Sequence, residues 1–93
     1  MNIYIIIHSF NEAYGLTKFY EVLEAYHTKE DAIAKIEDFK KRVRKGTSSF
    51  FRGMNVKEEP YAIPYIPGVT YEWYDESGAK MFSHFYVEEI TLK

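Results

Sequence analysis

Residues 28–46, TKEDAIAKIEDFKKRVRKG, carry the strongest secondary-structure pattern in this chain. Thr28 has the form of a helix N-cap, with an acid, Asp31, three residues later. Acids lead the stretch, bases end it, and Gly46 occupies the place of a left-handed C-cap residue. The pattern predicts an amphipathic helix over residues 29–45. Its single apolar stripe consists of Ala32, Ile33, Ile36, Phe39 and Val43.

The segment before this helix predicts two strands. Ile3–His8 is a continuous apolar and β-branched run, typical of a strand that is central in its sheet or covered on both faces. Lys18–His27 is rich in β-forming residues and predicts a second strand, antiparallel to the first. Glu21 and Glu24 break the alternation of this strand, which leaves room for a bulge. The polar residues 9–17 between the two strands predict a loop.

The segment after the helix predicts a long irregular connection and then a hairpin. Prolines and glycines within residues 47–69 argue against regular structure through most of that stretch. A loop of this length is uncommon in a compact domain and is often functional. Residues 70–75 and 79–92 predict two strands that pair around a turn at residues 76–78.

Length and element order predict one α+β domain over residues 1–93. A chain of 93 residues has room for a single core. The order β-β-α-loop-β-β predicts an antiparallel sheet of about four strands with one helix packed on a face. Aromatic residues make up 18% of the chain, and so many rings are difficult to bury in one small domain. A homo-oligomer is therefore compatible with the composition.

Composition also limits the compartment and the partners. The chain has no cysteine, which excludes a disulfide framework and fits a reducing cytoplasm. The apolar run at the N-terminus is too short for a signal peptide or a membrane span. A net charge of −2 opposes nonspecific binding of duplex nucleic acid, which depends on Lys and Arg. We expect a cytoplasmic protein that binds neither membrane nor duplex nucleic acid.

Residues 40–52 hold six of the twelve basic groups and no acid, between two segments that each carry a net charge of −4. One interpretation is structural, because the carbonyl groups at a helix C-terminus attract Lys and Arg. Three bases in or near this block also follow an acid by four residues, a stabilising spacing on a helix. These pairs are Asp31 with Lys35, Glu37 with Lys41, and Asp38 with Arg42.

The second interpretation is a ligand site built from what this pairing leaves over. The cations of the site have no helix acid four residues earlier or lie just beyond the helix. Charge holds a phosphate and a ring stacks a base, so the set predicts an anionic, nucleotide-like small molecule as ligand. The candidate site comprises four cations, two hydroxyl groups and two rings: Lys40, Arg44, Lys45, Arg52, Ser48, Ser49, Phe50 and Phe51.

The aromatic hairpin is a second candidate. Strand residues two apart share a face, so Tyr71 and Trp73 are expected together, with Tyr74 on the opposite face. One face can pack on the helix while the other rings form half-buried cross-strand pairs. Alternatively, Tyr71, Trp73 and Tyr74 form a surface that contacts a partner protein, because Tyr and Trp dominate interface hot spots.

The histidines do not indicate catalysis. His8 and His84 each neighbour a serine, and adjacent strand residues point to opposite faces, so neither makes a nucleophile–base pair by itself. Three scattered histidines without cysteine give no recognisable zinc spacing. We expect no enzyme, no metal and no cofactor. A small hydrolase would need the fold to bring His8 or His84 to a serine or a carboxylate in a cleft.

Three stretches resemble small phage-encoded proteins of unknown function: the opening run that ends at Ser9, EVLEAYHTKEDAIA at 21–34, and FYVEEITL at 85–92. The resemblance implies a host-defence antagonist in the host cytoplasm that blocks a host protein or sequesters a host signalling nucleotide. The expected function is a non-catalytic binding protein that sequesters a nucleotide-like signalling molecule. The alternative is a protein–protein inhibitor of a host defence protein that acts through the aromatic hairpin.

Overall fold

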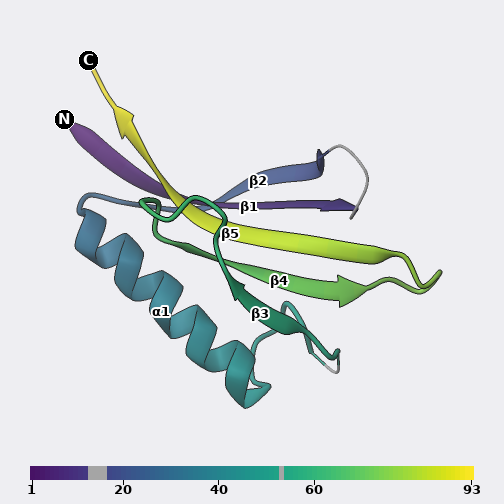
Figure 1. The fold of residues 1–93 in the computed structure, drawn as a ribbon. Coiled ribbons are helices and arrows are strands. Elements are labelled where there is room, and N and C mark those ends of the chain that lie inside the picture. Colours follow the sequence, from purple (N-terminus) through teal and green to yellow (C-terminus); the bar gives the residue numbers. More distant parts are fainter. Residues whose placement is uncertain (13–16, 53) are drawn as a thin grey trace.

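The computed structural model is an antiparallel five-stranded sheet with one helix across a face (Figure 1). It describes residues 1–12, 17–52 and 54–93, and only the backbone of residues 17–19. Neighbouring strands follow the order β2-β1-β5-β4-β3. The predicted α+β class is confirmed, with one strand more than expected. The elements are β1 (Asn2–Glu12), β2 (Thr17–Tyr26), α1 (Lys29–Lys45), β3 (Lys57–Pro60), β4 (Gly68–Tyr74) and β5 (Lys80–Thr91).

The helix has the ends that the sequence predicts. The Thr28 side-chain oxygen accepts a hydrogen bond from the Asp31 backbone N–H at 3.2 Å. Gly46 adopts the left-handed conformation with φ 74°, and its N–H donates to the Val43 carbonyl at 3.1 Å. In the described ranges of the chain, no helix is long and apolar enough to cross a bilayer.

Strand β1 is longer than the sequence predicts. It continues through Ser9–Glu12, which the polar composition assigned to a loop. The reason is tertiary: β5 supplies an antiparallel partner along the whole of β1, from Asn2 opposite Thr91 to Glu12 opposite Met81. Residues 13–16 of the expected loop lie outside the described residues. The β1–β2 register shifts between Ile6 and Ile7, so the bulge for which the sequence left room is present.

Strand β3 is the element that the sequence does not predict. Its four residues pair with β4, and Pro60 stands at its end opposite Val69. Proline is tolerated there because β3 is an edge strand and needs hydrogen bonds on one side only. Residues 61–67 are irregular, as expected. Gly68 then begins β4 where a β-carbon would lie 2.7 Å from the Phe85 carbonyl oxygen, so the close approach requires glycine.

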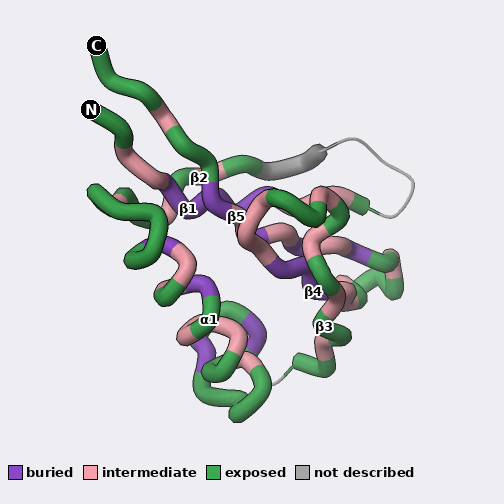
Figure 2. Tube along the Cα trace, turned by 60° about the vertical axis from the view of Figure 1, so that its left-hand side comes forward, coloured by how far each residue is buried: buried purple, intermediate pink, exposed green. Residues whose placement is uncertain are grey.

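The main core lies between α1 and the sheet. Figure 2 shows the buried parts of β1, β4 and β5 gathered in the middle of the sheet, with the chain ends exposed. Ala32 and Ile36 of α1 are buried against this face. Tyr71 and Phe85 are at most 1% exposed, and the centroids of their rings lie 6.1 Å apart. Strand β5 alternates strictly over residues 81–87, which places every second side chain in this core.

Among the residues that the structure describes, no helix covers the opposite face of the sheet, and the irregular segment of residues 61–67 covers part of it. The ring of Tyr61 stacks on Tyr86 with centroids 5.0 Å apart. Ile5 and Ile7 are buried on this face, which explains why the opening run of β1 is apolar at consecutive positions. Both faces of β1 are therefore removed from water, as its sequence predicts.

Candidate functional site

A cleft of about 460 Å³ separates one side of α1 from β1 and β2, and residues 47–50 close its end. We call it the helix–sheet cleft. Its floor is apolar and is formed by Ile6, Leu23, Ile36, Phe39 and Phe85. The Phe39 and Phe85 rings contact each other with centroids 4.5 Å apart. Phe85 is buried, so the partly exposed ring of Phe39 is the aromatic part of the floor that a planar ligand can reach.

Phe50 forms the end wall of the helix–sheet cleft. Its ring stands edge-on to Phe39 and Phe85, with centroid distances of 5.6 and 5.3 Å. These two contacts fix the ring, yet Phe50 remains 41% exposed. A large apolar side chain that is both held in place and open to solvent is available to a ligand.

The rim of the cleft carries two ion pairs. Lys35 Nζ lies 3.8 Å from Glu24 Oε1, and Arg42 Nε lies 2.9 Å from Asp38 Oδ2. The charges of these four lining residues cancel. Their side chains are 42–60% exposed, and ion pairs this exposed contribute little to stability. An anionic ligand can therefore replace Glu24 or Asp38 as the partner of Lys35 or Arg42 at a small cost in free energy.

Three hydroxyl residues follow the end of α1 and line the same cleft: Thr47, Ser48 and Ser49. Thr47 Oγ1 donates to the Arg42 carbonyl at 3.3 Å. Ser48 is buried, and its Oγ accepts from the Phe50 backbone N–H at 3.2 Å, which positions the end wall. Ser49 is exposed. The cleft thus joins an apolar floor to hydroxyl groups and exchangeable charges.

The structure divides the ligand site predicted from the sequence. Ser48, Ser49 and Phe50 line the helix–sheet cleft, whereas the other five residues do not. Phe51 was expected at a binding surface and is instead a core residue, 9% exposed, with its ring 5.1 Å from that of Tyr71. The remaining four are the predicted cations: Lys40, Arg44, Lys45 and Arg52.

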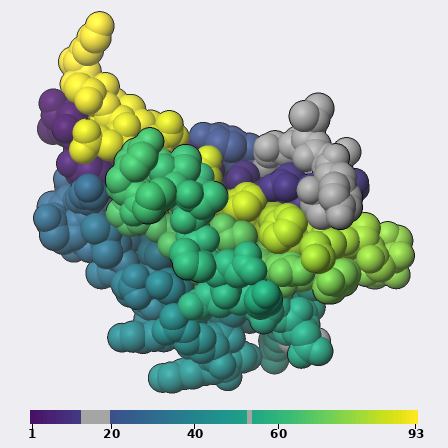
Figure 3. Space-filling model, in the orientation of Figure 1, coloured from purple at the N-terminus to yellow at the C-terminus, as the bar shows by residue number. Residues whose placement is uncertain are grey.

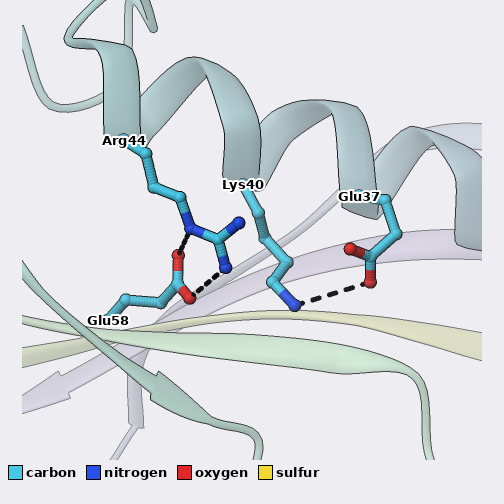
Figure 4. A network of polar contacts seen from close by, with 4 residues as sticks. All are labelled: Glu37, Lys40, Arg44 and Glu58. Carbon is cyan, nitrogen blue, oxygen red and sulfur yellow. Dashed lines mark hydrogen bonds and ion pairs between the residues drawn. The ribbon is translucent and has the colours of Figure 1, made fainter.

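Two of these cations have partners that the sequence did not predict (Figure 4). Lys40 Nζ lies 3.4 Å from Glu37 Oε1, one residue closer along the helix than the spacing used for the prediction. Arg44 donates two hydrogen bonds to Glu58 of β3, at 3.1 and 2.6 Å. This carboxylate raises the pKa of Arg44, first through the hydrogen bond and then through its charge. The expectation that Lys40 and Arg44 are uncompensated is therefore wrong.

Lys35 and Arg42, which the sequence-based prediction left out of the ligand site, are the cations that line the helix–sheet cleft. The predicted pair of Asp38 with Arg42 is confirmed, but Lys35 pairs with Glu24 of β2, not with Asp31, and Glu37 contacts Lys40, not Lys41. The sequence contains a pattern that places three of these rim residues together. Lys35, Asp38 and Arg42 follow one another at helical spacing beside the apolar stripe, so they share one side of α1.

The hairpin residues do not form one exposed surface. Tyr71 is fully buried, and burial is the main cause that raises its pKa. Trp73 is half-buried, and its Nε1–H donates to Ser83 Oγ at 2.8 Å. Tyr74 lies on the other face of β4 and is 58% exposed. Only Tyr74 of the predicted partner-binding set is largely exposed, because Tyr71 is buried in the core and Trp73 packs against that core.

His8 and His84 lie in hydrogen-bonded positions within the sheet. His8 Nδ1 is 3.2 Å from Glu21 Oε1, and its ring stacks on Phe85 at 4.4 Å. His84 Nδ1 lies 3.0 Å from Thr70 Oγ1, and its Nε2 lies 2.7 Å from Asn11 Oδ1. Neither histidine lines the helix–sheet cleft.

No protein-family model, curated protein or solved structure matches this chain. The function of the helix–sheet cleft is therefore inferred from the chemistry of its own residues.

Proposed function

We propose that this protein is a non-catalytic binding protein that captures an anionic, nucleotide-like small molecule in the helix–sheet cleft. One observation carries the proposal: a single cleft joins an aromatic floor to three hydroxyl residues and two exchangeable cations. A volume of about 460 Å³ lies within the roughly 300–1,000 Å³ range of small-molecule sites.

The base of such a ligand would lie on the apolar floor. Phe39 and Phe50 present rings that are fixed by contacts with each other and with Phe85. Stacking on aromatic side chains tolerates any base, because every base has a π-face. This part of the cleft selects for a flat ring without specifying which one.

The charged part of the ligand would meet the rim. Arg42 can turn from Asp38 to a phosphate, a group that its planar fork recognises through two parallel hydrogen bonds. Ser49 and Thr47 add hydroxyl groups beside it. A carboxylate released from its pair, Asp38 or Glu24, can accept a hydrogen bond from a ribose hydroxyl. In this arrangement a cation of the rim binds the phosphate and a carboxylate of the rim binds the sugar.

Sequestration in the cytoplasm of a phage-infected host is the biological role that we propose for this capture. It is supported by the resemblance of three sequence stretches to small phage-encoded proteins. A protein that removes a signalling nucleotide from solution needs tight binding and no turnover.

Thermal unfolding with a panel of cyclic and linear nucleotides tests the proposal. A ligand at a hundred times its dissociation constant stabilises the native state by about 2.7 kcal/mol. For a domain of this size that free energy raises Tm by about 10 °C or more. We expect at least one nucleotide to give this shift, and its nucleoside to give a smaller one.

Arg42→Ala should weaken the binding about tenfold or more, because a charge-assisted hydrogen bond is lost. Lys45→Ala is the matched control, since Lys45 is an exposed cation of the same helix that does not line the cleft. The proposal is wrong if no nucleotide shifts Tm, or if Lys45→Ala weakens the binding as much as Arg42→Ala.

A further inference from the structure

A cavity of about 250 Å³ lies between the end of α1 and the segment that leads into β3, and we call it the helix–β3 pocket. Figure 3 shows these two parts of the chain side by side in the lower part of the molecule. Four polar residues line the pocket: Arg44, Asn55, Glu58 and Tyr71. The remaining lining is apolar and includes Val43 and Val56. None of the lining residues belongs to the helix–sheet cleft, so the two cavities are distinct.

The hydroxyl group of Tyr71 is the unusual group of this pocket. Tyr71 is fully buried, and its ring is fixed by contacts with Phe39 and Phe51. Its hydroxyl makes no hydrogen bond of normal geometry with any residue that the structure describes. Such a buried group is unfavourable, because it has lost its hydrogen bonds to water. A ligand that accepts a hydrogen bond from this hydroxyl would remove that cost.

Glu58 and Arg44 lie beside this hydroxyl. Glu58 stands directly opposite Tyr71 in the β3–β4 register, so both side chains share the face of the sheet that α1 covers. Arg44 reaches the same carboxylate from α1 with two hydrogen bonds (Figure 4). Both residues act on the hydroxyl through their charges, and Glu58 does so from outside normal hydrogen-bond geometry. The three polar side chains therefore converge on one place.

The pocket presents a hydrogen-bond donor next to an acceptor. Burial, and then the charge of Glu58, raises the pKa of Tyr71, so its hydroxyl stays protonated and can donate. Each Glu58 oxygen accepts one hydrogen bond from Arg44 and has a lone pair left for a second. The charges of Arg44 and Glu58 cancel, so the charged lining favours neither an anion nor a cation.

We infer that the helix–β3 pocket binds a neutral carboxamide group, whose carbonyl oxygen accepts from the Tyr71 hydroxyl and whose N–H donates to Glu58. A carboxamide carries an acceptor and a donor side by side, which complements the hydroxyl and the carboxylate. Val43 and Val56 would contact its carbon substituent. Arg44, whose side chain is 56% exposed, is the lining residue that can move to admit the ligand. The inference does not depend on the proposed nucleotide capture.

A volume of about 250 Å³ lies below the roughly 300–1,000 Å³ of sites for larger ligands, so the group that binds is small. It has two sources, a free small molecule or an amide side chain of another protein. Acetamide represents the first, and capped glutamine represents the second, with capped alanine as the control for its backbone amides. Acetate and acetamidinium have the shape of acetamide but carry a negative and a positive charge. Titration of each probe, followed by NMR at the backbone amides of residues 55–58 and 70–72, reports binding at the pocket.

We expect acetamide or capped glutamine to bind with a dissociation constant several-fold lower than those of acetate and acetamidinium. Tighter binding of acetamide assigns a free small molecule, and tighter binding of capped glutamine assigns a protein side chain. The inference is wrong if neither carboxamide shifts these backbone amides. It is also wrong if either ion, or capped alanine, binds as tightly as the stronger of the two carboxamides.

Tyr71→Phe removes the hydroxyl and keeps the ring in the core. This variant should raise the dissociation constant of the carboxamide about two- to tenfold, as expected for the loss of one hydrogen bond. Its urea midpoint should not fall, because no hydrogen bond within the described protein is lost. Tyr74→Phe is the matched control, since Tyr74 is exposed and does not line the pocket. Unchanged binding by Tyr71→Phe, or an equal loss in Tyr74→Phe, would overturn the inference.

Glu58→Gln tests why the ligand is neutral. Without the carboxylate, Arg44 loses its partner and its guanidinium becomes available to an anion. We expect this variant to bind acetate more tightly than acetamide, which reverses the order of the parent protein. A retained preference for acetamide would show that Glu58 does not select the ligand and would contradict the donor–acceptor arrangement.

Discussion

The two faces of the sheet are buried by different means. Helix α1 covers one face, where Phe39, Tyr71 and Phe85 contact one another through their rings. No helix of the described part of the chain covers the other face, where polar contacts run from Asn11 through His84 to Thr70. The first face is stabilised mainly by apolar burial, whereas the second also depends on satisfied polar groups.

This difference explains where two cavities of the molecule lie. A helix laid across a twisted sheet cannot contact every strand equally, so it leaves the helix–sheet cleft on the side of β2. On its other side, two hydrogen bonds from Arg44 to Glu58 connect α1 to β3. The irregular segment covers the second face incompletely, and a cavity of about 440 Å³ lies at the border of this segment. Both cavities are places where a covering element ends.

The largest expected effect compares the same residue type on the two faces of β5. Phe85→Ala should lower the free energy of unfolding by about 3–5 kcal/mol, because it leaves a cavity beneath α1. Phe82→Ala, on the other face and only half-buried, should cost about 1 kcal/mol. Urea denaturation of both variants measures the difference. Equal losses would show that the covering helix does not make the first face the main core.

A smaller effect is expected at Gly68, where the irregular segment enters the sheet. A β-carbon at this position would lie 2.7 Å from the Phe85 carbonyl oxygen and 2.9 Å from Tyr86 Cβ. Gly68→Ala should therefore destabilise the protein by about 1–3 kcal/mol through overpacking. Thermal unfolding measures the loss. An unchanged Tm would mean that the segment can move away from β5 without cost.

The smallest effect should appear as a pH dependence of the second face. Burial, and then the charge of His8, lowers the pKa of His84 below its usual value of 6.5. As the pH falls through 6.5, His84 binds a proton in the unfolded chain before it does so in the native state. The free energy of unfolding should therefore fall as the solution is acidified from pH 7.5 to 5.5. His84 is only half-buried, so its contribution should stay well under the roughly 1.4 kcal/mol per pH unit of one full proton.

His84→Gln removes the titrating group and should flatten this part of the pH profile in urea denaturation. A parallel series on Phe82→Ala, which keeps His84, should retain the slope of the parent protein. If His84→Gln retains that slope as well, other groups are responsible for it.

The elements that follow from local sequence were the predictable ones. The Thr28 cap, the apolar stripe and the left-handed Gly46 define α1 through contacts within a few residues, and the terminal hairpin follows from two strand-forming runs around a turn. Strand β3 was not predictable in this way. It forms because β4 offers a free edge to residues 57–60, although Pro60 argues against a strand.

Local patterns in the sequence were sufficient to predict the type of fold, the ends of the helix, and three residues of the candidate site, Ser48, Ser49 and Phe50. The charges around these three residues depend on how the elements pack. Helix spacing predicted no carboxylate partner for Lys40 and Arg44, but Glu58 of β3 pairs with Arg44. The same spacing paired Arg42 with a carboxylate, yet it is Arg42 and Lys35 that line the cleft. The reason is physical: pairing along a helix depends on neighbours in sequence, whereas pairing between elements depends on where the sheet places them.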